Sequence, residues 1–210
     1  METSRSRGRP REFDRQAALA KATRVFWVKG YEATSITDLT EAMGIGSPSL
    51  YAAFGSKQAL YTEALQYYAD SNGSLVWGRF FAAANARDAV SCFLMDSAAA
   101  LTGCVADIPL GCMVTLSSVG GEGHFELGEL MRTQRGVTLA RLSERIAQAS
   151  KIGEIPVSVD VHALARFVQT VQFGMSILAR DGVTRNELEA VARLALDGWD
   201  ARIRETPEHK

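Results

Sequence analysis

The stretch from residue 35 to residue 57, SITDLTEAMGIGSPSLYAAFGSK, constrains the fold of this chain more than any other. Gly44 divides it, because glycine takes the left-handed conformation that ends a helix at no steric cost. Apolar residues recur at helical spacing on both sides: Ile36, Leu39 and Met43 before the glycine, and Leu50 and Phe54 after it. Two short helices joined by a tight turn are typical of a helix-turn-helix, whose second helix enters the major groove of DNA.

Residues that favour helix ends flank both predicted helices. Ser35 is expected to cap the first helix and Ser47 the second, with Pro48 as the first residue of the second helix. Gly55 ends that helix, and the next one begins near Lys57. A cation is disfavoured at a helix N-terminus unless a phosphate lies nearby, so Lys57 is predicted to bind the DNA backbone. The alternative is a solvated surface lysine.

The predicted DNA contacts also include a basic N-terminal arm. Residues 1–12 carry four arginines among serine, glycine and proline, a composition expected to be disordered alone and suited to a minor groove. A solvated tail is the alternative. Tyr51 and Lys57 are expected to hold phosphates, while small side chains of the second helix face base edges. The full predicted set is Arg9, Arg11, Ser35, Gly46, Ser47, Pro48, Ser49, Tyr51, Ala52 and Lys57.

Over the first third of its length the chain resembles the DNA-binding domain of the TetR/AcrR family of bacterial transcriptional regulators. The family pattern is a Thr/Ser-rich helix start, an Ala-Gly-Val-like turn, and then Leu-Tyr-x-x-Phe-x-x-Lys-x-x-Leu. Here the last part is LYAAFGSKQAL, residues 50–60. The chain departs from the pattern at Ala52, where the family often has His or Tyr.

This resemblance implies an all-α protein, with a three-helix helix-turn-helix head (residues 13–56) and a helical body for ligand binding and dimerisation (residues 71–210). A helix at residues 56–70 would connect the two, and its tilt would couple them. The implied function is that of a homodimeric regulator, expected to be a repressor, that binds a palindromic operator and is released by a small-molecule effector.

Composition places the chain among ordinary soluble proteins. Apolar residues make up 47% and charged residues 22% of its 210 residues. No apolar run approaches the roughly 20 residues of a membrane span. The three cysteines, Cys92, Cys104 and Cys112, fit a reducing compartment. We therefore expect a cytoplasmic, nucleoid-associated protein.

Charge divides the chain into a basic head and an acidic body. Residues 1–60 hold nine Lys/Arg against six Asp/Glu, and the remainder holds 14 against 18. A basic head suits a polyanionic partner such as DNA.

From residue 74 onward the pattern predicts helices alone. Asp70-Ser-Asn-Gly73 is expected to form a turn at the seam between head and body. No nucleophile–base pair, paired acids or metal-ligand spacing appears, so the sequence predicts neither an enzyme nor a metal or cofactor site. The expected helices span residues 74–84, 87–103, 111–119, 123–151, 158–180 and 185–204.

A ligand pocket lined by aromatic residues and methionines is expected between the body helices, with plain core packing as the alternative. The resemblance also supports an alternative regulator, because some relatives sense electrophiles or oxidants through a cysteine near such a Gly-Cys pair, here Gly111-Cys112. Inert buried thiols are the simpler interpretation. The predicted walls are Phe93, Leu101, Cys104, Met113, Leu116, Phe125, Met131, Phe167, Val171 and Met175.

The last two predicted helices are apolar on two faces, which favours a four-helix interface between two copies. A wholly internal hairpin is the alternative. The predicted interface residues are Phe167, Val171, Gly174, Leu178, Leu188, Val191, Leu194, Ala195 and Trp199.

Two other functions are weighed against this one. A helical enzyme or small-molecule-binding protein with a merely structural head would lack any recognisable catalytic set. A nucleoid-type DNA protein without a ligand would not need so large an apolar body.

Overall fold

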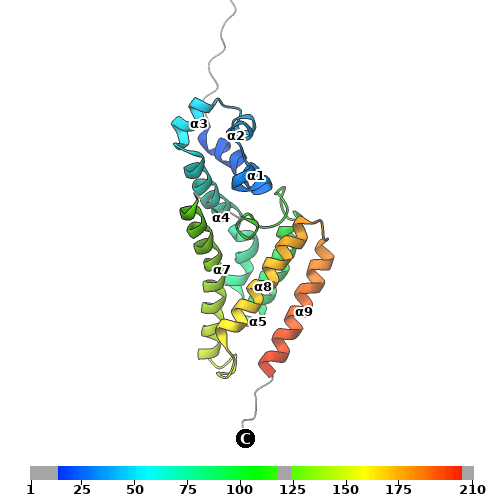
Figure 1. The fold of residues 1–210 in the computed structure, drawn as a ribbon. Helices are drawn as coiled ribbons and strands as arrows, with labels where there is room; N and C mark the ends of the chain where they lie inside the picture. Colours follow the sequence, from blue (N-terminus) through cyan, green and yellow to red (C-terminus); the bar gives the residue numbers. More distant parts are fainter. Residues whose placement is uncertain (1–13, 118–123, 205–210) are drawn as a thin grey trace, which may run out of the picture.

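The computed structural model describes residues 14–117 and 124–204 of the chain. Within these residues every regular element is a helix, which confirms the predicted fold class. Figure 1 shows a small head of α1, α2 and α3 at one end, and α4 running from it into a body of longer helices. The bounds are α1 Arg15–Ala33, α2 Ile36–Met43, α3 Ser47–Phe54, α4 Lys57–Ala82, α5 Ala86–Leu101, α6 Met113–Leu116, α7 Phe125–Lys151, α8 Val161–Arg180 and α9 Arg185–Arg204.

The head helices begin and end where local chemistry favours it. The amide of Ala17 donates to the Asp14 carboxylate (2.9 Å), which caps α1. Ser35 and Asp38 cap α2 reciprocally: the Asp38 amide donates to Ser35 Oγ (3.0 Å) and the Ser35 amide to Asp38 Oδ2 (2.8 Å). Gly44 ends α2 in the left-handed conformation, with φ of 72°. The predicted caps of α2 are therefore confirmed.

The predicted cap of α3 is wrong by one residue. Gly46 is the N-cap, and Ser47 is already helical. The Leu50 amide donates to the carbonyl oxygen of Gly46 (3.1 Å), so the first helical turn closes on the glycine. No side chain caps α3, which leaves its first amides for solvent or an anion.

The predicted turn at residues 70–73 is also wrong, because α4 continues through it as one helix of 26 residues. The side chain of Asn72 donates to the carbonyl oxygen of Tyr68 (3.1 Å), one turn earlier, and so does not interrupt the helix. Packing at both ends of α4 outweighs the weak local preference for a turn.

Two apolar cores hold α4, one at each end. Leu60 and Tyr61 belong to the head core, which also contains Met113 of α6 and Met131 of α7. Phe80 belongs to the body core, together with residues of α5, α7, α8 and α9. The head is therefore packed directly against two helices of the body.

The remaining helices follow the predicted segments closely, except α6. It covers Met113–Leu116 instead of residues 111–119, because Gly111 adopts φ of 74° and cannot continue a helix. Residues 118–119 of that prediction lie outside the described residues. Over residues 14–117 and 124–204, no helix has both the length and the apolarity to cross a membrane.

Candidate DNA-binding face and ligand cavity

Helix α3 presents a smooth, exposed face of small side chains. Leu50 and Phe54 are buried in the head core (0% and 4% exposed) and fix the rotation of the helix. The opposite face is exposed and consists of Ser47, Pro48, Ser49, Tyr51 and Ala52. These five predicted residues therefore lie together, on the side of α3 that is free to enter a groove.

The side chain of Arg15 on α1 binds both α3 and α4. Its Nη2 donates to both carboxylate oxygens of Glu63 on α4 (2.8 Å each) and to the carbonyl oxygen of Ala53 (3.3 Å). Its guanidinium also lies 4.4 Å from the centre of the Phe54 ring. Sequence reasoning gave Arg15 no role, because these partners come from α3 and α4 and share no local pattern with it.

Lys57 is the first residue of α4, three residues after the end of α3. Its Nζ lies 4.3 Å from the centre of the Tyr31 ring, and no carboxylate in the described residues pairs with it. Burial lowers the pKa of this ammonium, and the carboxylates of Glu32 and Asp38 oppose that shift. An ammonium held over a ring without a carboxylate partner is suited to an incoming phosphate.

The structure does not support the remaining predicted DNA-binding residues equally. Ser35 uses its hydroxyl and amide to cap α2, so its side chain is occupied. Gly46 is exposed at the start of α3. Arg9 and Arg11 lie outside the described residues, and their predicted role stays a prediction.

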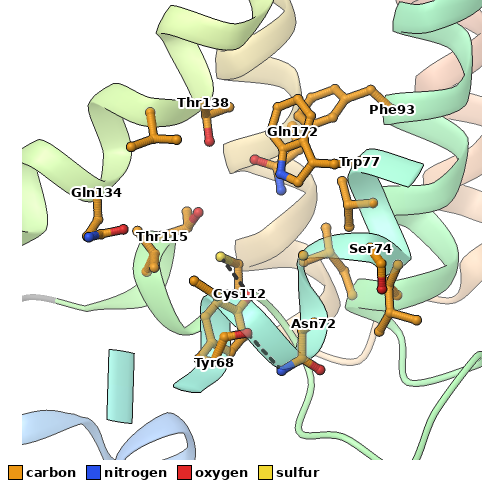
Figure 2. A pocket seen from close by; sticks show the side chains of 18 of the residues that line it. Tyr68, Asn72, Ser74, Trp77, Phe93, Cys112, Thr115, Gln134, Thr138 and Gln172 are labelled. Carbon is orange, nitrogen blue, oxygen red and sulfur yellow. Dashed lines mark hydrogen bonds between the residues drawn. The ribbon is translucent and has the colours of Figure 1, made fainter. Parts of the chain in front are cut away.

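A cavity of about 560 Å³ opens between α4, α5, α7, α8 and the segment between α5 and α6 (Figure 2). Its apolar wall includes Trp77, Phe81 and Phe93, and its polar wall includes Thr115, Gln134, Thr138 and Gln172. The guanidinium of Arg141 lies 4.9 Å from the centre of the Trp77 ring. This volume and mixed lining are typical of a small-molecule site.

Of the ten predicted wall residues, Phe93 and Leu101 line this cavity and the other eight do not. Met113 and Met131 belong to the head core, and Met175 to the body core. Cys104 is exposed, and Phe125 is 71% exposed. Leu116, Phe167 and Val171 also lie outside the wall. Apolar character identified residues that pack somewhere in several of these cases, but it could not show which of several faces each one joins, and at Cys104 and Phe125 the side chain is exposed.

The wall residues that the sequence-based prediction missed include aromatic ones, such as Trp77 and Phe81, and a set of polar ones. Gln172 is embedded in the apolar run of α8, and Gln134, Thr138 and Arg141 follow one face of α7 at helical spacing. Polar residues at such spacing, opposite an apolar helix, were the signal that could have revealed them. The predicted wall contains only apolar, aromatic and sulfur-containing residues, and so it leaves these polar positions out.

Cys112 lies in the cavity wall next to Tyr68. The Tyr68 hydroxyl donates to Cys112 Sγ (3.2 Å), as Figure 2 shows. Burial raises the pKa of Tyr68 well above its ordinary value, and the neighbouring thiol adds to this effect, so the phenol keeps its proton and stays a donor. The Cys112 amide donates to Ser176 Oγ of α8 (2.8 Å).

The cavity wall is tied to the head through the segment that precedes α6. The indole Nε1 of Trp27 on α1 donates to the carbonyl oxygen of Gly111 (3.1 Å). Arg24 on α1 donates to the carbonyl oxygen of Asp107 (2.7 Å) and pairs with its carboxylate (3.0 Å). Two residues of a head helix thus bind the segment that precedes α6, and one of them, Trp27, lines the cavity together with Gly111.

Helices α8 and α9 expose apolar side chains on one side of the body. Six of the nine predicted interface residues lie there at least partly exposed: Phe167, Val171, Gly174, Leu178, Val191 and Leu194. Leu188, Ala195 and Trp199 are instead buried in the body core, so their assignment to an interface is wrong. They occupy the inward face of α9, which packs against α5. Ile177, 53% exposed, was missed and lies on the outer face.

Comparison with known proteins gives concordant matches. The model of the bacterial regulatory proteins, tetR family, matches residues 18–64. The HTH-type transcriptional repressor ComR of Escherichia coli (strain K12) is 35% identical over 207 residues, covering 95% of each chain.

Solved structures agree with these matches. A cysteine mutant of the TetR family transcriptional regulator CifR, complexed with 26-base-pair operator DNA, is similar with a TM-score of 0.84 and 40% identity, over 91% of this chain and 100% of that one. A TetR transcriptional regulator from Rhodococcus sp. RHA1 is 38% identical with a TM-score of 0.58, over 88% of this chain and 99% of that one.

Proposed function

This chain belongs to the TetR family of bacterial regulatory proteins, and on that premise we propose that it is a transcriptional repressor. It binds a double-stranded operator as a homodimer and leaves it when a small molecule occupies the body cavity. The observation that carries this proposal is the exposed small-residue face of α3, whose start has no side-chain cap and whose end is followed by the ammonium of Lys57.

This face is suited to the major groove because its side chains are short. Ser47, Ser49 and Ala52 let the backbone of α3 approach the base edges, while Tyr51 and Lys57 contact phosphates at the rim. The free amides at the start of α3 add a further anion site. Short side chains provide few bidentate base contacts, so part of the operator preference comes from DNA shape.

Two copies are needed to read a palindrome, and the exposed apolar side of α8 and α9 is the surface on which they pair. Leu194 is 70% exposed and Ile177 53% exposed, which is costly on a monomer surface when neighbouring side chains are also apolar. A twofold contact there sets the spacing of the two α3 helices, which should match successive major grooves about 34–36 Å apart.

Effector control follows from the contacts between the cavity wall and α1. A ligand that changes the position of the Gly111–Cys112 segment also moves the carbonyl oxygen that accepts from Trp27. The effector lowers DNA affinity only as far as it binds the DNA-incompetent state more tightly.

A gel shift with the DNA upstream of the chain's own gene tests the proposal. The wild type should retard it at low ionic strength and release it as salt rises, whereas Leu50→Asp should not bind, because the charge disrupts the packing that orients α3. Retention of DNA by this variant, or indifference of the wild type to all double-stranded DNA, would contradict the proposal.

A thiol-responsive form of the same regulator is the second candidate, favoured by the place of Cys112 in the cavity wall against Tyr68. Modification of Sγ would fill part of the cavity and displace the tyrosine. Labelling with a thiol reagent should then weaken operator binding in the wild type and in Cys104→Ser, whose thiol lies outside the cavity, but not in Cys112→Ser. Unchanged affinity after full labelling removes this candidate.

A further inference from the structure

The cavity wall contains a buried amide without a hydrogen-bond partner. Gln172 is 7% exposed, and among the residues that the structure describes nothing donates to or accepts from its side chain. Figure 2 shows this amide facing the cavity. Its nitrogen and oxygen atoms are reached from the cavity, and no described side chain or backbone group competes for them, so the amide is available to hydrogen-bond a ligand there.

Gln169, one turn earlier on the same helix, provides the contrast. It is 3% exposed, but its Nε2 donates to the carbonyl oxygen of Arg135 (2.9 Å) and its Oε1 accepts from Arg166 (2.8 Å). Packing therefore satisfies the buried glutamine that lies outside the cavity and leaves unsatisfied the one that faces into it.

The same wall contains a guanidinium that forms no ion pair with a described carboxylate. Arg141 lies over the rings of Trp77 (4.9 Å) and Phe81 (5.6 Å), and in the described part of the chain no carboxylate pairs with it. Arg135, the other arginine of the wall, is already hydrogen-bonded, because it donates to the carbonyl oxygens of Val114 and Ser117. Asp70, the wall's acid, is exposed and accepts from Gln66 (2.9 Å).

The aromatic part of the wall lies directly under the guanidinium of Arg141. Trp77 lies at 33° to Phe93 with ring centres 4.7 Å apart, and at 29° to Phe81 with centres 6.0 Å apart. The rings pack on one another, and the accessible part of this aromatic wall favours the packing of a flat, apolar ring system. A cavity of about 560 Å³ has room for more than one fused ring.

We infer that the effector is an aromatic carboxylate with two or more rings, whose ring system packs against Trp77 and Phe81. Its carboxylate pairs with the guanidinium of Arg141, and a polar atom bonds the amide of Gln172. A planar guanidinium favours carboxylates, because it forms two parallel hydrogen bonds with them. This inference rests on the proposed function in assigning the cavity to an effector.

Isothermal titration calorimetry of the full chain with 2-naphthoate, and with neutral 2-naphthamide of the same shape, tests the inference. Wild type should bind the carboxylate about tenfold more tightly than the amide. Arg141→Gln should weaken the carboxylate about tenfold and leave the amide unchanged. Gln172→Leu should weaken both ligands, because it removes the buried hydrogen-bonding group.

Arg132→Gln is the matched control, since Arg132 is also on α7 but is exposed and pairs with Glu129 outside the cavity. It should bind both ligands as the wild type does. Equal affinity of the wild type for carboxylate and amide, or undiminished binding of naphthoate by Arg141→Gln, would overturn the inference.

Operator binding without ligand is measured on the same preparations. Variants that retain DNA binding are folded, so their calorimetry reports the cavity alone. A protein that binds the operator but not naphthoate contradicts this inference and leaves the proposed function standing. A protein that binds naphthoate but no DNA contradicts the proposed function and leaves the cavity's ligand class standing.

Discussion

The guanidinium of Arg180, at the end of α8, donates to the backbone carbonyl oxygen of Trp27 on α1 across 2.9 Å. Its other nitrogens donate to the carbonyl oxygens of Val28 (3.1 Å) and Leu110 (3.0 Å). One side chain of the body therefore joins a head helix to the segment that borders the cavity. Burial lowers the pKa of Arg180 from a value so high that the side chain stays charged in the physiological range.

Replacing Arg180 should remove the hydrogen bonds that join the end of α8 to α1 and to Leu110. We expect Arg180→Leu to lower the free energy of unfolding by about 1–3 kcal/mol, because three backbone carbonyl oxygens lose a charged donor. Urea denaturation measures this change. Arg202→Leu, at an exposed position near the end of α9, should change stability little. If Arg180→Leu unfolds at the same urea concentration as the wild type, the three hydrogen bonds contribute no net free energy to stability.

Removing Lys57 should weaken DNA binding for every sequence alike. Lys57→Ala loses a phosphate contact, so the slope of log affinity against log salt should become shallower by about 1. Titrations of operator and unrelated DNA at several salt concentrations measure both effects. Lys151→Ala, exposed at the far end of α7, is the control. A loss confined to one operator sequence would assign Lys57 to a base instead.

Stability should fall between about pH 4 and pH 2 through Asp38. The hydrogen bond from Lys29, and then those from Ser35, lower the pKa of Asp38 from 3.8 to about 2. A carboxylate whose pKa is lower in the folded state stabilises the fold above its unfolded pKa, and this stabilisation is lost as pH falls through the folded pKa. Urea midpoints of wild type should therefore drop more over this range than those of Asp38→Asn. Parallel pH curves for the two proteins would contradict this assignment.

Placing a charge on the outer face of α9 should prevent dimerisation. Leu194→Asp puts a carboxylate at the centre of the proposed interface, where it would be desolvated, and we expect a monomer in sedimentation at micromolar concentration. Val157→Asp, at a position 91% exposed between α7 and α8, should remain dimeric. A dimeric Leu194→Asp protein would place the interface elsewhere.

The helix-turn-helix was predictable because its determinants are local. The capping box of Ser35 and Asp38 and the left-handed Gly44 depend on residues at most a few positions apart. Leu50 and Phe54 fall at one helical spacing and are both buried. The same reasoning located α5, α7, α8 and α9, since each carries its own apolar periodicity and its own end signals.

The cavity was not predictable in the same way. Phe93 and Met175 are both buried in the body core, yet only Phe93 also lines the cavity. Periodicity identifies the inward face of a helix, but it does not identify which neighbour that face meets. The two arginines of the wall illustrate this, because only their partners distinguish Arg135, which bonds carbonyl oxygens, from Arg141, which does not.

By itself, the sequence determined an all-α chain with a helix-turn-helix head and an exposed small-residue face on its second helix, since caps, turns and apolar spacing act over one or two helical turns. Tertiary structure alone decided that α4 runs unbroken through residues 70–73, that Trp199 faces inward, and that Gln172 and Arg141 share a cavity wall. These features arise from packing between segments far apart in the chain, and the free energy of that packing exceeds the local preferences on which sequence reasoning depends.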